Sequence, residues 1–300
     1  MNDAVFDADA MKRLVVWIHT REEVRKKKEA GKPPPWTTDE IIANWRFCCV
    51  RRNDDKVTRW IHTNWLDPHS GDPDLWFAMV VARLVNWPDT LERLTKTVFN
   101  GSGKVRWLNL AFVSEMHLRK AQGEKVFSGA YIVSTNGVTQ DKAEYLMERV
   151  LTPLWNARSA IRPRFTSGDS DTLEAFHRRL MQFDGMGSFM AAQVVADIKY
   201  DPRSPLRTAP DWQYWAAPGP GSKRGLNRVM GADHDRSFTD REWTFHFADL
   251  LQLVNMRLSP RMGGPLTGQD LQNCLCEFDK YERVRLGQGK PRSGYTAVQQ

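Results

Sequence analysis

The sequence predicts a mainly α-helical protein built as two lobes. In most segments apolar residues recur every three or four positions, a spacing that places them on one face of a helix. Tracts rich in β-branched and aromatic residues are few, so we expect at most a small β-ribbon. The 300 residues are enough for one large domain or two small lobes with a sizeable core. We therefore expect one unit, residues 1–300, with a cleft between two helical lobes.

The N-terminal half contains most of the predicted helices. Apolar spacing predicts them at residues 11–18, 73–86, 88–99, 104–121 and 140–155. Another helix is expected to begin at Thr37-Thr38-Asp39-Glu40, which has the pattern of a capping box. Residues 126–134 are the best strand candidate, because a hairpin-type turn, Thr135-Asn136-Gly137, follows them. Residues 156–171 are polar and are expected to be a connector.

The C-terminal half is predicted to be helical as well, with helices at residues 172–183, 188–200, 240–257 and 271–281. The approximate division that we expect is a helical lobe at 36–170, a hairpin and aspartate-loop segment at 171–231, and C-terminal helices at 232–295. The tail from Gly287 is rich in Gly, Arg, Lys and Gln, and we expect it to be flexible or to lie on a partner.

A helix, a Gly-x-Gly turn and a second helix follow one another between residues 172 and 200. Gly185 and Gly187 allow a tight turn and leave backbone N–H groups uncovered, and Ser188 is an N-cap candidate. Amides at a helix N-terminus suit a phosphate, so these three residues, with Lys56, are our candidate DNA contacts. The alternative is an ordinary helical turn.

With Asp211 after the second helix, this layout resembles the helix-hairpin-helix DNA glycosylases. The resemblance implies a two-lobed, glycosylase-like fold, a hairpin that grips a DNA phosphate, and an aspartate in the base pocket. The chain departs from that family in two ways. The usual Leu-Pro-Gly-Val-Gly is replaced here by Phe-Asp-Gly-Met-Gly, and the hairpin contains no lysine nucleophile.

Composition favours an anionic partner and a reducing environment. The formal net charge is +7 and the sequence pI is about 9.3. The four cysteines, Cys48, Cys49, Cys274 and Cys276, fit neither a disulfide framework nor zinc-finger spacing, so we expect reduced thiols in a cytoplasmic protein. A metal site split between the two cysteine pairs is the alternative. The sequence shows no apolar run of membrane length and no signal peptide, so we expect no membrane partner.

A second informative stretch combines charged and aromatic residues. Arg51, Arg52, Asp54 and Asp55 lie between aromatic residues, which are Trp45, Phe47 and Trp60. This framing indicates partial burial, and buried charges need partners or a function. Surface salt bridges are the simpler alternative.

Three segments together resemble the α-glutamyl/putrescinyl-thymine pyrophosphorylases, which are amino acid:DNA transferases of phage and bacterial DNA hypermodification. The segments are Arg46-Phe47-Cys48-x-Val50-Arg51-Arg52-x-Asp54-Asp55-x-Val57-Thr58-Arg59-Trp60, Gly219-Pro220-Gly221-Ser222-x-Arg224-Gly225-Leu226-Asn227-Arg228, and Leu275-Cys276-Glu277-Phe278-Asp279-Lys280-Tyr281. The resemblance spans roughly residues 40–295. Cys49 stands where this family is expected to have asparagine.

The resemblance implies a reaction on DNA in which 5-hydroxymethyluracil has already been phosphorylated. An amine, such as an amino acid or putrescine, displaces the phosphate or pyrophosphate from the 5-methylene carbon, and the glycosidic bond survives. The implied partners are that DNA and a small amine, inside a bacterial or phage-infected cell.

The leaving group is a dense anion, so cations should meet it. We predict that Arg51, Arg52, Lys223, Arg224 and Arg228 do so, and that Gly219, Gly221 and Ser222 complete the binding site with backbone and hydroxyl groups. The segment Gly-Pro-Gly-Ser-Lys-Arg-Gly lacks the ending of a Walker A motif, so we predict no ATP site.

The incoming amine must lose a proton, and Asp211 is our first candidate for the base, followed by Asp55. Trp212 is a candidate for stacking on a flipped nucleotide, with an ordinary core position as the alternative, and Asn44 and Asn227 are candidates for reading its pyrimidine edge. We predict no required cofactor. If magnesium binds the leaving phosphates, its candidate ligands are Asp54, Asp55 and Asp197.

Two other functions fit parts of the sequence. A monofunctional glycosylase would share the hairpin and Asp211 but has no evident need for the Arg51-Arg52 and Lys223-Arg224 pairs. A non-enzymatic, basic DNA-binding module would explain the charge and the hairpin but not the charged stretch framed by tryptophans. The identity of the amine stays open, because both acidic and basic residues are available for its pocket.

Overall fold

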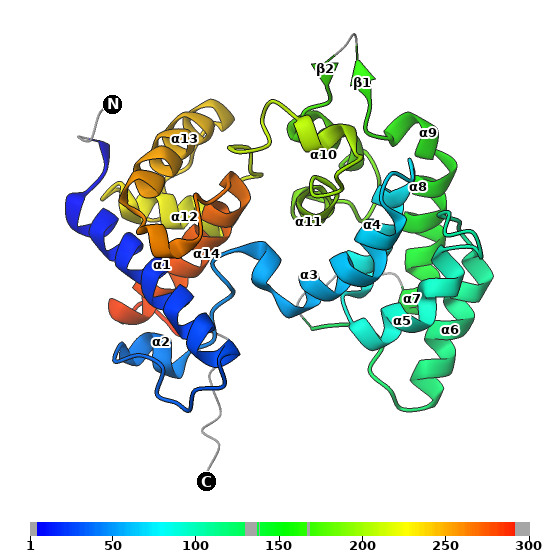
Figure 1. The fold of residues 1–300 in the computed structure, drawn as a ribbon, viewed down its shortest axis with the longest axis horizontal. Coiled ribbons are helices and arrows are strands. Elements are labelled where there is room, and N and C mark those ends of the chain that lie inside the picture. Colours follow the sequence, from blue (N-terminus) through cyan, green and yellow to red (C-terminus); the bar gives the residue numbers. More distant parts are fainter. Residues whose placement is uncertain (1–4, 130–136, 138, 167–168, 292–300) are drawn as a thin grey trace. The chain divides into compact units, whose positions relative to one another are not determined.

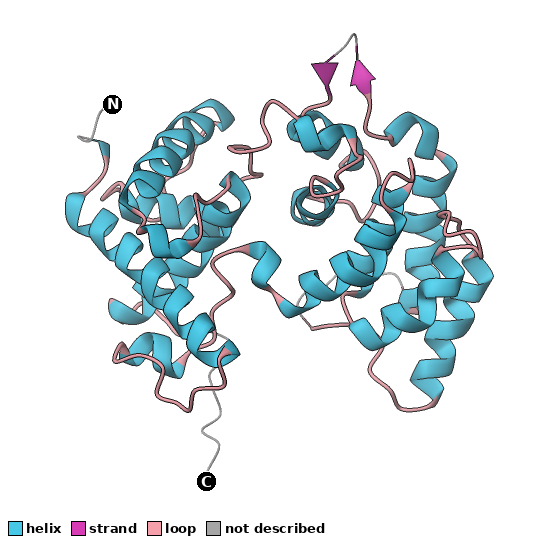
Figure 2. Ribbon diagram, viewed as in Figure 1, coloured by secondary structure: helices cyan, strands magenta, loops and turns pink. Residues whose placement is uncertain are grey.

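The chain forms two compact units in the computed structural model, which describes residues 5–129, 137, 139–166 and 169–291 (Figure 1). Residues 1–55 and 218–300 make the first, here called the terminal unit, and residues 56–217 make the second, the central unit. The prediction of a mainly α-helical protein is confirmed, as Figure 2 shows.

The named elements of the terminal unit, in its described part, are all helices. Its elements are α1 (Ala8–Glu29), α2 (Glu40–Asn44), η2 (Arg52–Asp54), α12 (Pro220–Val229), α13 (Asp240–Arg257), η7 (Pro260–Met262) and α14 (Gly268–Arg285). Helix α2 begins where the capping pattern predicts, because the Asp39 side chain accepts a hydrogen bond from the Ile42 amide. Helix α1 packs on α12, α13 and α14, so both ends of the chain share one core.

The central unit contains shorter helices and one small ribbon. Its elements up to residue 121 are α3 (Lys56–Ile61), η3 (His62–Leu66), η4 (Asp67–His69), α4 (Leu75–Val85), α5 (Pro88–Val98) and α6 (Asn109–Ala121). Those that follow are α7 (Lys142–Tyr145), η5 (Leu146–Leu151), α8 (Thr152–Asn156), α9 (Arg158–Ile161), β1 (Phe165–Thr166), β2 (Asp169–Ser170), α10 (Leu173–Leu180), α11 (Ser188–Ile198) and η6 (Pro205–Thr208). Strands β1 and β2 are antiparallel, with Phe165 opposite Ser170.

Several expected boundaries differ from the observed ones. The helix expected at 140–155 is divided by η5, a π-helical turn, and the connector expected at 156–171 contains α9 and the ribbon. The strand candidate at 126–134, with its turn, falls largely outside the described residues. The chain passes between its units at residues 55–56 and 217–218, whereas we expected divisions near 170 and 231. The reason is that α1 packs with the C-terminal helices, a contact that local sequence patterns do not record.

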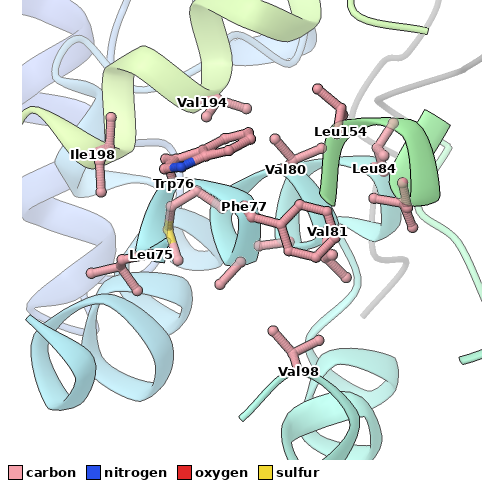
Figure 3. Close-up of a cluster of buried hydrophobic side chains, with 14 of the residues drawn as sticks. Leu75, Trp76, Phe77, Val80, Val81, Leu84, Val98, Leu154, Val194 and Ile198 are labelled. Atoms are coloured by element: carbon pink, nitrogen blue, oxygen red, sulfur yellow. The ribbon is translucent and has the colours of Figure 1, made fainter. Parts of the chain in front are cut away.

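Helix α4 is the centre of the core of the central unit. All of its residues are buried, so it is apolar on every side and not only along one face. Figure 3 shows Trp76, Phe77 and Val80 of α4 among side chains from other helices, including Val194 of α11 and Leu154 of α8. Because α4 has neighbours on all sides, it fixes α11 and hence the hairpin that α11 forms with α10.

One ion pair lies inside this apolar core. Asp197 and Arg83 have exposed fractions of 0% and 1%, and two Arg83 nitrogens donate to the two Asp197 oxygens at 2.6 Å and 2.5 Å. Burial opposes the charge of Asp197, but the Arg83 guanidinium outweighs it and holds the pKa of this carboxyl well below its usual range. Asp197 is therefore a structural partner of Arg83, which removes it from our candidate magnesium ligands.

In the terminal unit, α12 approaches α14 so closely that glycine is required. A Cβ at Gly225 would lie 2.1 Å from the Leu275 carbonyl oxygen, and one at Gly221 would lie 2.5 Å from the Cys276 sulfur. These glycines are four residues apart and so share one face of α12. The glycine-rich segment that we predicted as a phosphate-binding loop is thus the first part of a tightly packed helix.

No helix in the described part of the chain combines the length and the apolar character needed to cross a bilayer.

We predict that Gly225→Ala destabilises the terminal unit by about 3 kcal/mol or more, because the new methyl group meets backbone that cannot move alone. Urea unfolding measures the change. The matched control is Gly219→Ala at the start of the same helix, where the nearest atom would be at 3.5 Å, an ordinary contact. Equal stabilities for the two variants would contradict the close packing.

We predict that Asp197→Asn costs about 3–5 kcal/mol, because it leaves the buried Arg83 charge without its counter-ion. Since the pKa of Asp197 is lowered by folding, its contribution is present above the usual carboxyl range and is lost only in strong acid. Unfolding free energies at about pH 7 test this expectation. Asp184→Asn, in the exposed turn of the same unit, should leave stability unchanged.

Candidate functional site

In the terminal unit, helix α14 brings together the second and third motif segments and the part of the first that ends at Asp55. On one side, the segment that contains Arg51 and Arg52 runs along it. The Cys48 amide donates to Glu277 Oε2 at 3.1 Å, and the Arg52 amide donates to Asp270 Oδ1 at 3.0 Å. On the other side, α12 packs against α14. Segments that are more than two hundred residues apart in the sequence thus meet on one helix.

Where α12 meets α14, three arginines surround one buried carboxylate. Asp279 is 0% exposed. Arg228 Nε donates to its Oδ1 at 2.8 Å and Arg224 Nε to its Oδ2 at 3.0 Å, while Arg283 Nε forms an ion pair with Oδ2 at 3.4 Å. We call these four residues the arginine cluster. With three cations and one anion, the cluster carries an excess charge of about +2.

Arg51 lies in the terminal unit but contacts backbone. Its guanidinium donates to the Pro265 carbonyl at 2.9 Å and to the Met262 carbonyl at 3.0 Å, and it also reaches the Gly264 carbonyl. These bonds hold the loop that precedes α14. The predicted role of Arg51 as a phosphate ligand therefore competes with a structural one.

The residues at the start of α12 bond mainly to each other. The Gly219 amide donates to Ser222 Oγ at 3.0 Å, and Ser222 is fully buried. Gly219 is thus an N-cap whose amide is already satisfied, and Gly221 faces α14. Lys223, the next residue, is half-buried and forms no ion pair with any described residue.

The two asparagines predicted to read a base make local bonds. Asn227 is 0% exposed, and its Nδ2 donates to the carbonyls of Arg236 at 2.8 Å and His234 at 3.2 Å. Asn44 is exposed, and its Nδ2 donates to the Glu40 carbonyl at 2.8 Å within α2. Asn227 is therefore a buried clamp on the loop after α12, a position that does not suit base reading.

The candidate carboxylates of the charged stretch differ in exposure. Asp55 is exposed, whereas Asp54 is half-buried and forms an ion pair with Arg25 Nε at 3.2 Å. Burial raises the pKa of Asp54, and Arg25 offsets part of that effect. Asp197 belongs to the central unit, where both of its oxygens accept hydrogen bonds from Arg83. In the described chain, only Asp233, His234 and Asp235 have the spacing that could hold a metal.

The central unit contains the predicted hairpin. Gly185 has a φ of +74°, and a Cβ there would lie 2.5 Å from a Val150 methyl carbon, so this turn needs glycine. His177 Nε2 lies 2.9 Å from the Ser188 carbonyl oxygen and, as a donor, ties α10 to the start of α11. Burial lowers the pKa of His177, so the ring is neutral at pH 7. Gly187 is exposed and is the N-cap of α11.

Asp211 caps helix α10. Its Oδ1 accepts from the Leu173 amide at 2.8 Å and its Oδ2 from the Glu174 amide at 3.0 Å, while Thr172 accepts from the Ala175 amide. The first amides of α10 are therefore satisfied by the protein itself. Burial raises the pKa of Asp211, and the two amide bonds only partly offset it. Both oxygens of our first candidate base are thus already occupied.

Trp212 and Lys56 also belong to the central unit. The Trp212 indole donates to the Lys199 carbonyl at 3.1 Å, and the Lys199 ammonium lies 4.3 Å from the centre of the ring system. Arg207 lies 5.1 Å from the same centre. Trp212 therefore packs on protein cations. Lys56 is exposed at the start of α3.

The comparisons with known proteins agree on one modified base. The family model described as "5-hmdU DNA kinase, helical domain" matches residues 8–290, nearly the whole chain. The chain belongs to this family. A curated relative from Bacillus phage SP10, named "5-hmdU DNA kinase", is 23% identical over 272 residues, which cover 84% of this chain and 41% of the relative. The chain thus spans about two fifths of that relative's length. No solved structure matches.

Membership of the 5-hmdU DNA kinase helical-domain family supports the coarser part of the resemblance and does not test the finer part. The expected connection with modified thymine in phage DNA is supported by these names. However, the names of the family and of the relative both describe a kinase and do not mention amine transfer. The finer assignment to the pyrophosphorylases therefore rests on the sequence motifs alone.

Sequence reasoning missed Arg283 and the role of Asp279 in this helical domain. Both lie on α14, four residues apart, and Arg224 and Arg228 have the same spacing on α12. That spacing was a usable signal, because such residues share a helix face. The burial of Asp279 could not be predicted from the sequence, because it depends on the packing of α12 against α14.

We predict that Asp211→Ala destabilises the protein by about 1–2 kcal/mol, as expected for the loss of a helix cap, and that Asp211→Asn costs less because it keeps one acceptor oxygen. Because folding raises the pKa of Asp211, its contribution is largest in acid and falls as the pH rises through the folded value. Unfolding at about pH 4 and about pH 7 measures this trend, which Asp211→Asn should remove. A variant without any stability change would refute the capping role.

Proposed function

We propose that this chain acts on DNA that carries 5-hydroxymethyluracil or its phosphorylated form, in the hypermodification of thymine in phage-infected bacteria. The observation that carries the proposal is the family match over residues 8–290. Two further observations support it. The chain has a net charge of +7, which suits a polyanion, and two of its motif segments, on α12 and α14, meet at the arginine cluster.

The reaction that we propose is displacement at the 5-methylene carbon of the phosphorylated base. The C–O bond breaks and its electron pair leaves with the phosphate or pyrophosphate. The nitrogen of an amino acid or polyamine forms the new C–N bond and then loses a proton to a base. No organic cofactor is required for this exchange, and a bound cation would serve only to neutralise the leaving phosphates.

In this proposal, Arg224 and Lys223 meet the leaving group, whereas Arg228, which is bonded to Asp279 and Gln288, supports the cluster from its buried side. Arginine suits that task, because its planar fork donates two parallel hydrogen bonds to an oxyanion. We now favour Asp55 over Asp211 as the base that accepts the proton. Asp55 is exposed, whereas both carboxylate oxygens of Asp211 accept hydrogen bonds from amides of α10. Gly187 and Ser188, at the exposed start of α11, are the proposed contacts to the DNA backbone.

A second candidate function follows from the relative's name, which is a 5-hmdU DNA kinase. In that case the chain would bind the modified DNA, and phosphoryl transfer would depend on a nucleotide site. The segment 219–225 does not supply one in the described chain, because its glycines face α14. The kinase function would then require a nucleotide site outside this segment.

We predict that the protein converts DNA containing phosphorylated 5-hydroxymethyluracil, in the presence of amino acids and polyamines, into DNA with a heavier thymidine adduct. Digestion to nucleosides and mass spectrometry measure the product and identify the amine from its mass. Arg224→Gln should reduce turnover, since it removes a ligand of the leaving group. Arg241→Gln, an exposed arginine of α13, is the matched control.

Parallel reactions separate the alternatives. Phosphorylation of 5-hydroxymethyluracil DNA with ATP, by this chain alone or with a partner, would replace amine transfer with the kinase function. Released base and abasic sites would indicate a glycosylase. DNA binding without any change in the nucleosides, across all these substrates, would leave a DNA-binding module and overturn the proposed reaction.

A further inference from the structure

We propose that Arg224 and Arg283, both held by the buried carboxylate of Asp279, form a binding site for a phosphate group with more than a single negative charge, either a phosphate monoester or a pyrophosphate. Arg283 is thereby a new ligand and Asp279 a positioning residue. The inference depends on the proposed function only for the source of that phosphate group in DNA. The site itself is defined by contacts within the terminal unit.

The three arginines of the cluster are not equivalent. The Arg228 side chain is only 6% exposed, and its Nη2 donates to Gln288 Oε1 at 2.9 Å, so both edges of its guanidinium are occupied. The Arg224 and Arg283 side chains are each 33% exposed. Arg228 thus completes the buried part of the cluster, and the other two arginines form its accessible edge.

The guanidinium groups of Arg224 and Arg283 are both held by one oxygen of the Asp279 carboxylate. Each contacts Asp279 Oδ2 through Nε, at 3.0 Å and 3.4 Å. Since both Nε atoms lie within 3.4 Å of one oxygen, the two guanidinium groups are neighbours. Their Nη groups have no other partner among the described residues, so most donors of both forks remain available. Two adjacent forks with available donors are the arrangement that binds oxyanions by paired hydrogen bonds.

The two arginines come from different helices, so their spacing depends on how α12 sits on α14. Gly221 and Gly225 let the helices touch without intervening side chains, and a Cβ at Gly225 would meet the Leu275 backbone. Such a contact leaves little room for sliding. Together with the bonds to Asp279, it fixes Arg224 and Arg283 before any ligand arrives, which lowers the entropic cost of binding.

Charge selects the class of phosphate. The cluster has an excess charge of about +2, and a phosphate monoester carries about −1.5 to −2 at pH 7. A backbone phosphodiester carries only a single negative charge. A monoester therefore neutralises the cluster and a pyrophosphate carries still more negative charge, whereas a phosphodiester leaves the cluster positive. The simpler explanation of the cluster is an ordinary set of surface salt bridges, in which Asp279 merely offsets part of the positive charge.

The test is binding of inorganic phosphate and pyrophosphate to the full chain, measured by calorimetry and by the ligand-induced rise in Tm. We expect pyrophosphate to bind, and we expect Arg283→Gln and Arg224→Gln each to weaken it about tenfold or more. Arg283→Lys should also weaken it, because lysine keeps the charge but loses the fork. Arg241→Gln removes the same charge from an exposed site on α13 and should bind as the wild type does.

The variant Asp279→Asn tests whether Asp279 positions the two arginines or whether only the net charge of the cluster matters. If the cluster acts only through its net charge, removing the carboxylate raises that charge and tightens binding. If Asp279 positions the two forks, binding weakens although the charge has risen. We expect weaker binding. Should this variant fail to fold, the Arg283 and Arg224 variants still decide the matter, since both side chains are partly exposed.

Two results would overturn the proposal. One is equal pyrophosphate binding by the wild type and Arg283→Gln. The other is protection by unmodified duplex DNA, lost in Arg283→Gln, without any response to phosphate or pyrophosphate, which would make the cluster a contact to backbone phosphodiesters. Neither measurement requires catalysis, so a negative nucleoside analysis with positive pyrophosphate binding would refute the proposed reaction and leave this site standing.

Discussion

The contact between α12 and α14 is the constraint on which the terminal unit depends. Because Gly225 brings the backbone of one helix against that of the other, the side chains beyond the contact are placed with little freedom. Helix α14 then serves as a shared surface. It binds the segment around Arg52 through Asp270 and gathers the arginines of α12 around Asp279. The buried acids of α14 thus organise both neighbours, and the positive charge that they do not cancel is left at the edge.

The central unit achieves the same rigidity by a different route. Its hairpin packs against α4, which is buried on all sides, and is held by hydrogen bonds of Asp211 and His177. Each of these polar groups satisfies a backbone atom of α10 or α11. Residues that the sequence suggested as catalytic, above all Asp211, therefore have a structural role. The chemistry that we propose therefore depends more on the terminal unit than the motif around Asp211 suggested.

The helices were predictable from the sequence where one apolar face alternates with a polar one. Helices α5, α10 and α13 fall close to their expected ranges for this reason. The π-helical turn η5 was not predictable from the sequence, because one extra residue per turn changes only a few contacts and leaves the apolar spacing nearly intact. The glycine-rich segment misled us for a related reason. Glycine and proline usually mark loops, yet Pro220 begins α12 and the glycines serve a helix contact whose partner lies far along the chain.

The candidate site was predictable in its residue types but not in its grouping. The motif segments that contain Arg52 and Arg224 both contact α14, the helix that carries Asp279. Asn227 and Arg51 were assigned to a ligand because polar residues in motifs suggest binding, whereas in the structure both donate to backbone carbonyls. Arg283 lay outside the quoted motifs and gains its meaning only from its neighbours in space.

The division of the chain has a consequence for protein synthesis. The terminal unit combines residues 1–55 with residues 218–300, so its first helix leaves the ribosome long before α12 and α14 exist. The central unit, in contrast, is one continuous segment and is able to fold as soon as residue 217 has emerged. Helix α1, which buries Leu14, Trp17 and Ile18 in the finished unit, must wait with these side chains uncovered. Its highly charged C-terminal half, which includes Lys26, Lys27 and Lys28, helps to keep the nascent segment in solution during that delay.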